Sequence, residues 1–180
     1  MDIGLFVNIT SRAWALPILS RLHEGVAARQ APLLAATGAS RTAFAQSLDH
    51  LITIGLVERN PGYGHPLRPE FRLTPRGIAA AAIANKIQSV PMNEGQDLLR
   101  RSWTLPVLTS LYAPSHFNQI KRNLRSITDR ALSQSLKAME SRQWVCRSVD
   151  QDARPPRSIY RAVNTGAVIS KITAPEIRFG

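Results

Sequence analysis

Two stretches of the sequence recur in the same order, and this repeat constrains the fold more than any other feature. Residues 12–22 and 101–111 are identical at six of eleven positions at an offset of 89, with one Trp and one Pro at matching places. Residues 44–59 and 132–147 share five identities at an offset of 88. Similar segments in the same order predict one structural unit that is present twice.

The 180 residues suffice for two small domains. We predict a first domain over residues 1–90 and a second over residues 91–180. An alanine-rich run over 78–88 favours a connecting helix, which Pro91 and Gly95 would end. This helix is expected to pack on one copy or between the two.

Each copy predicts a helix, a short helix, a longer helix and then two strands around a tip rich in Pro and Gly. The predicted fold class is therefore mainly α with small β-hairpins (α+β), in the winged helix-turn-helix arrangement. In the first copy the expected elements are helices containing 17–23, near 32–36 and from an N-cap at Ser40 to about Ile54, and strands at 56–59 and 70–74 around a tip at 60–69. In the second copy, from near Leu98, they are a helix near 116–124 capped by Ser115, a helix within 127–143, strands at 144–147 and 158–163 around a tip at 148–157, and a helical turn or two after Gly166.

The helix within 127–143 has the composition of a helix that enters a DNA groove. Leu132, Leu136 and Met139 recur at a spacing of four and three residues, which predicts a single buried stripe. The remaining faces are polar and carry more positive than negative charge. Each copy also has a proline in its first helix, Pro17 and Pro106. Either the helix begins close to the proline, or it kinks there.

Charge points to a polyanionic partner. The chain has 23 Lys plus Arg against 12 Asp plus Glu, a net charge of +11, which favours nucleic acid or an acidic membrane surface. Residues 1–95 carry a net +3 and residues 96–180 a net +8, so we expect most of the attraction in the second copy. No apolar run approaches the ~18 residues of a membrane-spanning helix. The start of the chain lacks the pattern of a signal peptide, so we expect a cytoplasmic protein with no membrane partner.

Few residues suggest metal or covalent chemistry. Cys146 is the only cysteine, which excludes an intramolecular disulfide and a cysteine-based zinc cluster within one chain. The four histidines lack metal-ligand spacing, and we expect no metal and no cofactor. We interpret Cys146 as a bystander thiol. Five aromatic residues are expected in the core: Trp14, Trp103, Trp144, Phe44 and Phe117.

The second copy resembles the HxlR branch of the MarR-like bacterial transcription regulators. The resemblance covers residues 103–166 and lies in W-T-L-P-V-L, H-F-N-Q-I-K-R-N-L, L-S-Q-S-L-K-A-M-E-S-R-Q-W-V and the arginine-rich tip with its return strand. The first copy is similar, but A-P-L-L-A-A-T-G-A-S replaces the basic second helix. Members of that family usually carry one such unit and pair as homodimers. The Cys-Pro dipeptide that often precedes the first Trp in the family is missing, so thiol-based sensing is not carried over.

The resemblance implies double-stranded DNA as the partner, because the second helix of the motif reads base edges. Asp129 is expected to cap this helix rather than to contact DNA. The expected reading residues are Thr128, Arg130, Ser133, Gln134 and Lys137 in the second copy, and Ser40, Arg41, Thr42, Gln46 and His50 in the first. The expected phosphate contacts are Arg100, Arg101, Lys121, Arg122 and Arg125, and the expected contacts from the tips are Arg68, Arg154 and Arg157.

Other interpretations remain open at this point. Each arginine could be an ordinary solvated surface charge, and each tip an ordinary surface loop. Tandem winged helices also serve as protein-docking adaptors, so the alternative function is an adaptor without specific DNA binding. An enzyme is not predicted, since the sequence has no paired carboxylates, phosphate loop or nucleophile with a base nearby. A homodimer through the connecting helix is a further expectation.

Overall fold

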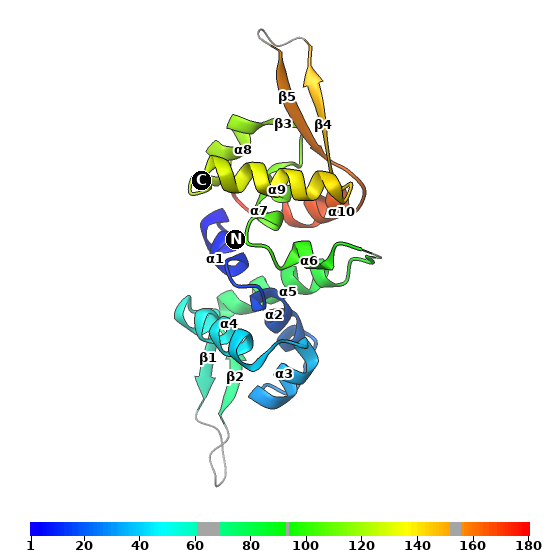
Figure 1. Cartoon of the computed structure of the whole chain (residues 1–180). Helices are drawn as coiled ribbons and strands as arrows, with labels where there is room; N and C mark the ends of the chain where they lie inside the picture. Colours follow the sequence, from blue (N-terminus) through cyan, green and yellow to red (C-terminus); the bar gives the residue numbers. More distant parts are fainter. Residues whose placement is uncertain (61–68, 93, 152–155) are drawn as a thin grey trace. The chain divides into compact units, whose positions relative to one another are not determined.

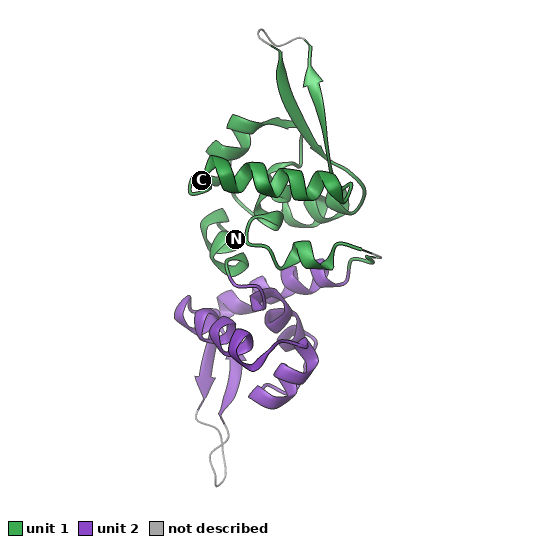
Figure 2. Ribbon diagram, in the orientation of Figure 1, with its two compact units in different colours: residues 1–11, 90–180 green, residues 12–89 purple. Residues whose placement is uncertain are grey.

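The computed structural model describes residues 1–60, 69–92, 94–151 and 156–180 (Figure 1). The chain divides into two compact units (Figure 2). Unit 1 comprises residues 1–11 and 90–180, and unit 2 comprises residues 12–89. The first eleven residues thus belong to unit 1, together with residues 90–180, and not to the unit formed by the segment that follows them.

Unit 2 has three helices, a two-stranded antiparallel sheet and a fourth helix. The elements are α2 (Ala15–His23), α3 (Gln30–Thr37), α4 (Arg41–Thr53), β1 (Val57–Asn60), β2 (Glu70–Leu73) and α5 (Pro75–Gln88). The core is formed by buried side chains of α2, α4 and α5, among them Leu19, Phe44, Leu51 and Ile87. The expected connecting helix is thus α5, and it packs against α2 of its own unit.

Unit 1 repeats this order with additional elements. They are α1 (Ile3–Thr10), α6 (Gln96–Leu99), α7 (Thr104–Ser110), β3 (Ser115–His116), α8 (Phe117–Leu124), α9 (Asp129–Ser141), β4 (Val145–Asp150), β5 (Arg157–Ala162) and α10 (Asn164–Thr173). The sheet is antiparallel, with β5 between β3 and β4. Figure 1 shows the β4–β5 hairpin projecting from the helices of this unit. With helices and small antiparallel sheets in both units, the fold is α+β, as predicted.

The first ten residues show no clear sequence pattern, and residues 3–10 form α1. The Asp2 carboxylate caps this helix by accepting a hydrogen bond from Gly4 N at 2.7 Å. Phe6 and Ile9 are buried, and α1 contacts α7. Asp2 also forms a parallel bridge with Arg178, so the two terminal segments of unit 1 lie side by side.

The prolines in the first helix of each unit lie at helix starts. Helix α2 begins at Ala15 and α7 at Thr104, which makes Pro17 and Pro106 the third residue of their helices. Amides in the first turn have no partner within the helix, so a proline there removes no hydrogen bond. Of the two options left open by the sequence, the helix beginning close to the proline is the correct one.

Helix caps were predicted correctly in one unit and incorrectly in the other. Ser40 caps α4 by accepting from Ala43 N at 3.3 Å, as expected. In α9 the cap is Thr128, which accepts from Ala131 N at 3.2 Å, so the prediction that Asp129 caps this helix is wrong. The prediction for Ser115 is also wrong. That residue is part of β3, and α8 begins without a side-chain cap.

The hairpin of unit 1 is longer than predicted. Strand β4 pairs with β5 from Val145–Ala162 to Asp150–Arg157, so both ends of the expected tip at 148–157 are paired strand residues. The short strand β3 was not predicted, since two residues carry no alternation pattern. Helix α10 starts at Asn164 and ends at Thr173, so seven of its ten residues follow Gly166, in agreement with the expected turn or two. The centre of the tip and the unit 2 tip at 61–68 lie outside the described residues.

Two glycines allow the same close backbone approach in the two units. A Cβ atom on Gly77 of α5 would lie 1.9 Å from the Leu56 carbonyl oxygen, and one on Gly166 of α10 would lie 2.1 Å from the Trp144 carbonyl oxygen. These carbonyls accept from Thr74 N at 3.0 Å and from Val163 N at 2.9 Å, respectively. Only glycine fits where helix and strand backbones approach this closely.

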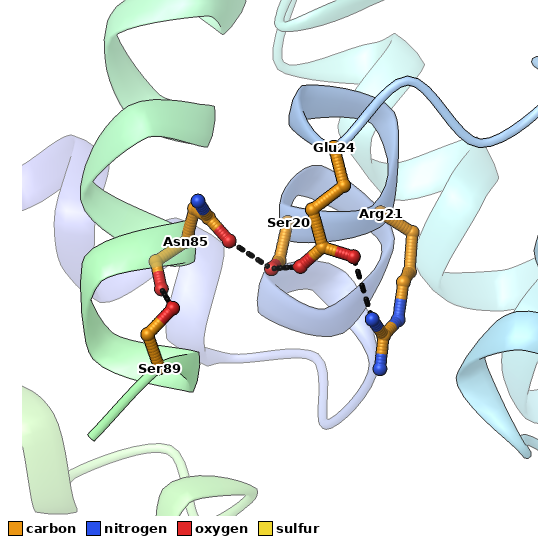
Figure 3. Close-up of polar contacts among 5 residues, drawn as sticks. All are labelled: Ser20, Arg21, Glu24, Asn85 and Ser89. Carbon is orange, nitrogen blue, oxygen red and sulfur yellow. Dashed lines mark hydrogen bonds and ion pairs between the residues drawn. The ribbon is translucent and has the colours of Figure 1, made fainter.

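Unit 2 has a polar contact between α2 and α5 (Figure 3). The Ser20 hydroxyl lies 3.0 Å from Glu24 Oε1 and 3.1 Å from Asn85 Oδ1, and Arg21 Nη1 donates to Glu24 Oε2 at 2.6 Å. The hydrogen bond from Arg21 is the largest effect that lowers the pKa of Glu24, because it stabilises the ionised carboxylate. Asn85 in turn accepts the Ser89 hydroxyl at its backbone carbonyl.

Of the five aromatic residues expected in the core, two are buried and three are only partly buried. Phe44 and Trp144 are buried, as predicted. Trp14, Trp103 and Phe117 are only half-buried, so the prediction that they are core residues was too strong. Within the described residues, no single helix is long and apolar enough to span a membrane; α1 and α2 reach that length and apolarity only as a broken pair.

Candidate nucleic-acid interface

Helix α9 has one buried side and one exposed polar side. Leu132, Leu136 and Met139 are buried, so the predicted stripe is confirmed. The residues expected to read DNA are all exposed: Thr128, Arg130, Ser133, Gln134 and Lys137. Because the apolar stripe fixes the rotation of the helix against the core, the polar side chains have one defined outward direction.

Arg130 and Lys137 carry the charge of this outer face. Neither has a hydrogen-bond or ion-pair partner within the part of the chain that the structure describes. They lie seven positions apart, or about two helical turns, which places them on one side of the helix. A helix that presents two unpaired cations on the same side as Ser133 and Gln134 combines charge with hydrogen-bonding groups.

The first turn of α9 is joined to α8 by an ion pair. Lys121 Nζ lies 2.7 Å from Asp129 Oδ1, and both side chains are substantially exposed. The carboxylate also lies in the first turn of α9, where a negative charge interacts favourably with the helix dipole. Asp129 therefore orders the N-terminal end of α9 relative to α8 and partly neutralises Lys121.

The other cations expected to contact phosphate have partners of their own. Arg122 Nη2 donates to Gln119 Oε1 and Arg125 Nη2 to the Gly180 carbonyl oxygen, each at 2.5 Å. Arg101 Nη2 lies 3.5 Å from Asp97 Oδ2. Arg100 is exposed and is not without an interaction partner. All four side chains remain on the surface, so these contacts position the cations without removing their charge from solvent.

The β4–β5 hairpin adds cations that the sequence reasoning missed. Arg147 of β4 is exposed and donates through Nε to the Ser158 hydroxyl at 2.9 Å. Arg157, which was predicted, begins β5 and is exposed, whereas Arg154 lies outside the described residues. Alternation along the strand would have placed Arg147 on the face of the buried Val145, two residues before it, so no sequence pattern indicated its exposure.

His116 connects the base of α8 to the hairpin. Its Nδ1 lies 3.0 Å from the Ser158 carbonyl oxygen, which requires Nδ1–H to donate. Its Nε2 lies 3.4 Å from Asp150 Oδ2 on β4. Since β3, β4 and β5 all contribute to this contact, His116 fixes the hairpin relative to the helix that follows it.

Unit 2 presents a matching but less basic helix. Arg41, Thr42 and Gln46 are exposed on α4, and Ser40 is occupied as the cap. His50 is half-buried and has an interaction of its own. The preceding helix, α3, contains no charged residue, whereas α8 carries Lys121 and Arg122. Arg68 lies outside the described residues.

The two units have nearly equal net charges, although the charges of residues 1–95 and 96–180 predicted a large difference. Unit 2 contains 9 Lys plus Arg and 4 Asp plus Glu, a net of +5, and unit 1 contains 14 and 8, a net of +6. The expected asymmetry shrinks because residues 1–11 and 90–95 bring two acidic residues into unit 1. The units differ in where the cations lie, on α8 and α9 in unit 1, rather than in total charge.

The described residues show no metal centre. Among them, no three His, Cys, Asp or Glu side chains lie close enough to hold an ion. Cys146 is an exposed free thiol on β4. A small hollow of about 170 Å³ lies beside α9, lined by Gln134, Ser135 and residues 101–103. It borders the polar face and offers a recess next to Gln134.

Residues 98–175 match the family model described as HxlR-like helix-turn-helix. Proteins of this family are typically DNA-binding transcription regulators rather than enzymes. The match covers α7 to α10 and therefore includes α8, α9 and the β4–β5 hairpin. No curated protein and no solved structure matches the chain.

Proposed function

We propose that this protein is a transcription regulator that binds specific sequences of double-stranded DNA through α9 of unit 1. The observation that carries the proposal is the outer face of α9, where Arg130 and Lys137 are exposed and unpaired beside Ser133 and Gln134. Arginine can bind guanine, and glutamine adenine, through two hydrogen bonds in the major groove. The helix lies inside the region that matches a helix-turn-helix family.

In this proposal the other basic residues position the protein on the duplex. Arg100, Arg101, Lys121, Arg122 and Arg125 contact phosphates beside the groove that α9 enters. The β4–β5 hairpin acts as the wing, and its arginines reach the flanking backbone or the minor groove. These contacts set register and affinity, whereas the α9 side chains distinguish sequences.

We further propose that unit 2 is a second winged helix. Its support is the shared order of three helices, two strands and a helix. Ser40 and Thr128 cap equivalent helices, and Gly77 and Gly166 make the same close approach to a carbonyl. Two such units in one chain could occupy two half-sites of one DNA target, with the unit 2 helix α4 making the weaker contacts.

Homodimerisation through α5 stays a prediction. Most apolar residues of α5, such as Ile83 and Ile87, are already buried, and Ile78 is the large apolar side chain of this helix that remains exposed. Sedimentation equilibrium of the full chain and of Ile78→Glu tests it. A dimer that the substitution dissociates supports the contact, and a monomer at all concentrations contradicts it.

The DNA-binding proposal is tested by selecting bound fragments from sheared genomic DNA and measuring affinity for the selected sequence. We expect Arg130→Ala to weaken binding by about fivefold to a hundredfold, the effect of losing one base contact. Lys171→Ala removes an exposed cation of α10 in the same unit, outside the residues assigned to the DNA interface, and serves as the charge-matched control. A pool without sequence preference, combined with a stable protein complex, would instead support an adaptor.

A further inference from the structure

His116 lies where the three strands of unit 1 meet. It belongs to β3 and pairs in register with Ile159 of β5, and its side chain contacts both strands of the hairpin. It is the only histidine in residues 1–11 and 90–180. The proposed contacts with DNA do not include this residue.

The two ring nitrogens of His116 face two hydrogen-bond acceptors. Nδ1 lies 3.0 Å from the Ser158 carbonyl oxygen, and a carbonyl oxygen only accepts, so Nδ1 carries a proton. Nε2 lies 3.4 Å from Asp150 Oδ2. In a neutral ring with its proton on Nδ1, Nε2 is itself an acceptor, and its lone pair faces the carboxylate. Only the doubly protonated ring donates to both partners.

Asp150 is the carboxylate that faces His116. Strand register and alternation place both residues on one face of the sheet, between positions 157 and 161 of β5. The other charged or titratable groups that β4, β5 and α8 contribute within the described residues are Cys146, Arg147, Arg157, Tyr160, Arg161, Lys121 and Arg122. A positive ring is repelled by these cations and attracted by Asp150, the group within ion-pair distance.

The contact also bears on the arginines of the hairpin. Ser158 accepts from His116 at its carbonyl oxygen, and its hydroxyl accepts from Arg147 Nε at 2.9 Å. Asp150 pairs in register with Arg157 at the end of the described β4–β5 ladder. His116 therefore joins the start of α8 to the two parts of the hairpin that carry Arg147 and Arg157.

We propose that doubly protonated His116 positions the β4–β5 hairpin for DNA binding, so that affinity for DNA rises as pH falls. Histidine is the side chain that ordinarily changes charge between about pH 5 and 8. The contact with Asp150 is complete when the ring is positive and is lost as pH rises and the ring becomes neutral. The inference rests on the proposed function, because the hairpin arginines act on DNA only if the protein binds it.

The first test measures the hairpin in the full chain without DNA. Residual dipolar couplings of the amides at 145–150 and 157–162 report bond orientation, and the ring C–H signals of His116 report its protonation. We expect the couplings to change with the same midpoint as the ring signals. In His116→Gln, whose amide stays neutral, the couplings should not change with pH. Couplings that ignore the ring, or that change equally in the variant, would overturn the proposal.

The second test measures affinity for the selected DNA fragment at pH 6 and pH 8 at one ionic strength. We expect the affinity to be about two- to fivefold higher at pH 6, the range of one partly exposed ion pair. Asp150→Asn keeps the charge of the ring, but the new amide can donate to an unprotonated Nε2. The ratio of the two affinities should therefore fall toward that of His116→Gln. His23→Gln replaces an exposed histidine of α2 in unit 2 and should keep the ratio of the unsubstituted protein.

The outcomes separate this inference from the proposed function. If Asp150→Asn keeps the full ratio, the ring attracts DNA only through its charge, and the proposal is overturned. DNA binding with the same ratio in His116→Gln and in the unsubstituted protein would overturn the inference and leave the proposed function intact. If no DNA binds at either pH, the proposed function fails, and the dipolar couplings alone decide whether His116 positions the hairpin.

Discussion

Replacing Gly166 with alanine should destabilise unit 1, although alanine is the better helix former. The added Cβ would lie 2.1 Å from the Trp144 carbonyl oxygen, and Cβ atoms essentially never approach a heavy atom closer than 3.0 Å. Helix α10 and the start of β4 would therefore have to separate by about 1 Å. That carbonyl accepts from Val163 N at 2.9 Å, and the separation would weaken this bond.

The magnitude follows from three contributions. Overpacking costs about 1–3 kcal/mol, and a lost hydrogen bond about 1 kcal/mol. The higher helix propensity of alanine stabilises the helix by about 1 kcal/mol. We therefore expect the free energy of unfolding of unit 1 to fall by about 2 kcal/mol.

The assay is urea unfolding followed by tryptophan fluorescence in a Trp14→Phe background. Trp103 and Trp144 then report on unit 1 alone. The control is Gly4→Ala in α1, where the new Cβ meets only the Asp2 side chain at 2.9 Å, which can move. Equal stability of Gly166→Ala and Gly4→Ala would refute the reasoning, because the close backbone approach would then be unimportant.

Three further predictions concern single side chains. Asp129→Asn should raise affinity for the selected DNA by roughly threefold in a fluorescence anisotropy titration, because it frees Lys121 and removes a negative charge near phosphate; unchanged or weaker binding would contradict this. Gln143 has a φ of 55°, so the substitution Gln143→Gly should raise the free energy of unfolding of unit 1 by about 0.5–1 kcal/mol in urea unfolding. A loss of stability would count against strain at this position. Arg21→Ala should raise the pKa of Glu24 toward its ordinary value in a carboxyl NMR titration. The native Glu24 contact stabilises the fold above the pKa of the unfolded chain and is lost as pH falls through the lowered pKa, and a pKa unchanged by the substitution would rule out Arg21 as its main cause.

Local signals in the sequence predicted the helices of the candidate site. The buried stripe of α9 depends only on helical spacing, and the Ser40 cap only on a hydroxyl before a helix. Asp129 was misassigned because Thr128 and Asp129 are adjacent and both residue types form caps. The choice depends on where the helix starts and on Lys121, which lies on another helix and draws the carboxylate away.

Features made by distant segments could not be predicted in the same way. Strand β3 has two residues and exists because Ser115 and His116 pair with β5, which no local pattern shows. The association of α1 with unit 1 depends on its contact with α7 and on the bridge from Asp2 to Arg178.

The central claim is that α9 reads DNA sequence, and the most direct measurement is the salt dependence of affinity for the selected fragment and for a scrambled fragment. We expect Arg130→Ala with Lys137→Ala to reduce the preference for the selected fragment by at least about tenfold. Lys171→Ala should leave that preference unchanged. A steep salt dependence with equal affinity for both fragments, unaffected by the α9 substitutions, would contradict the account.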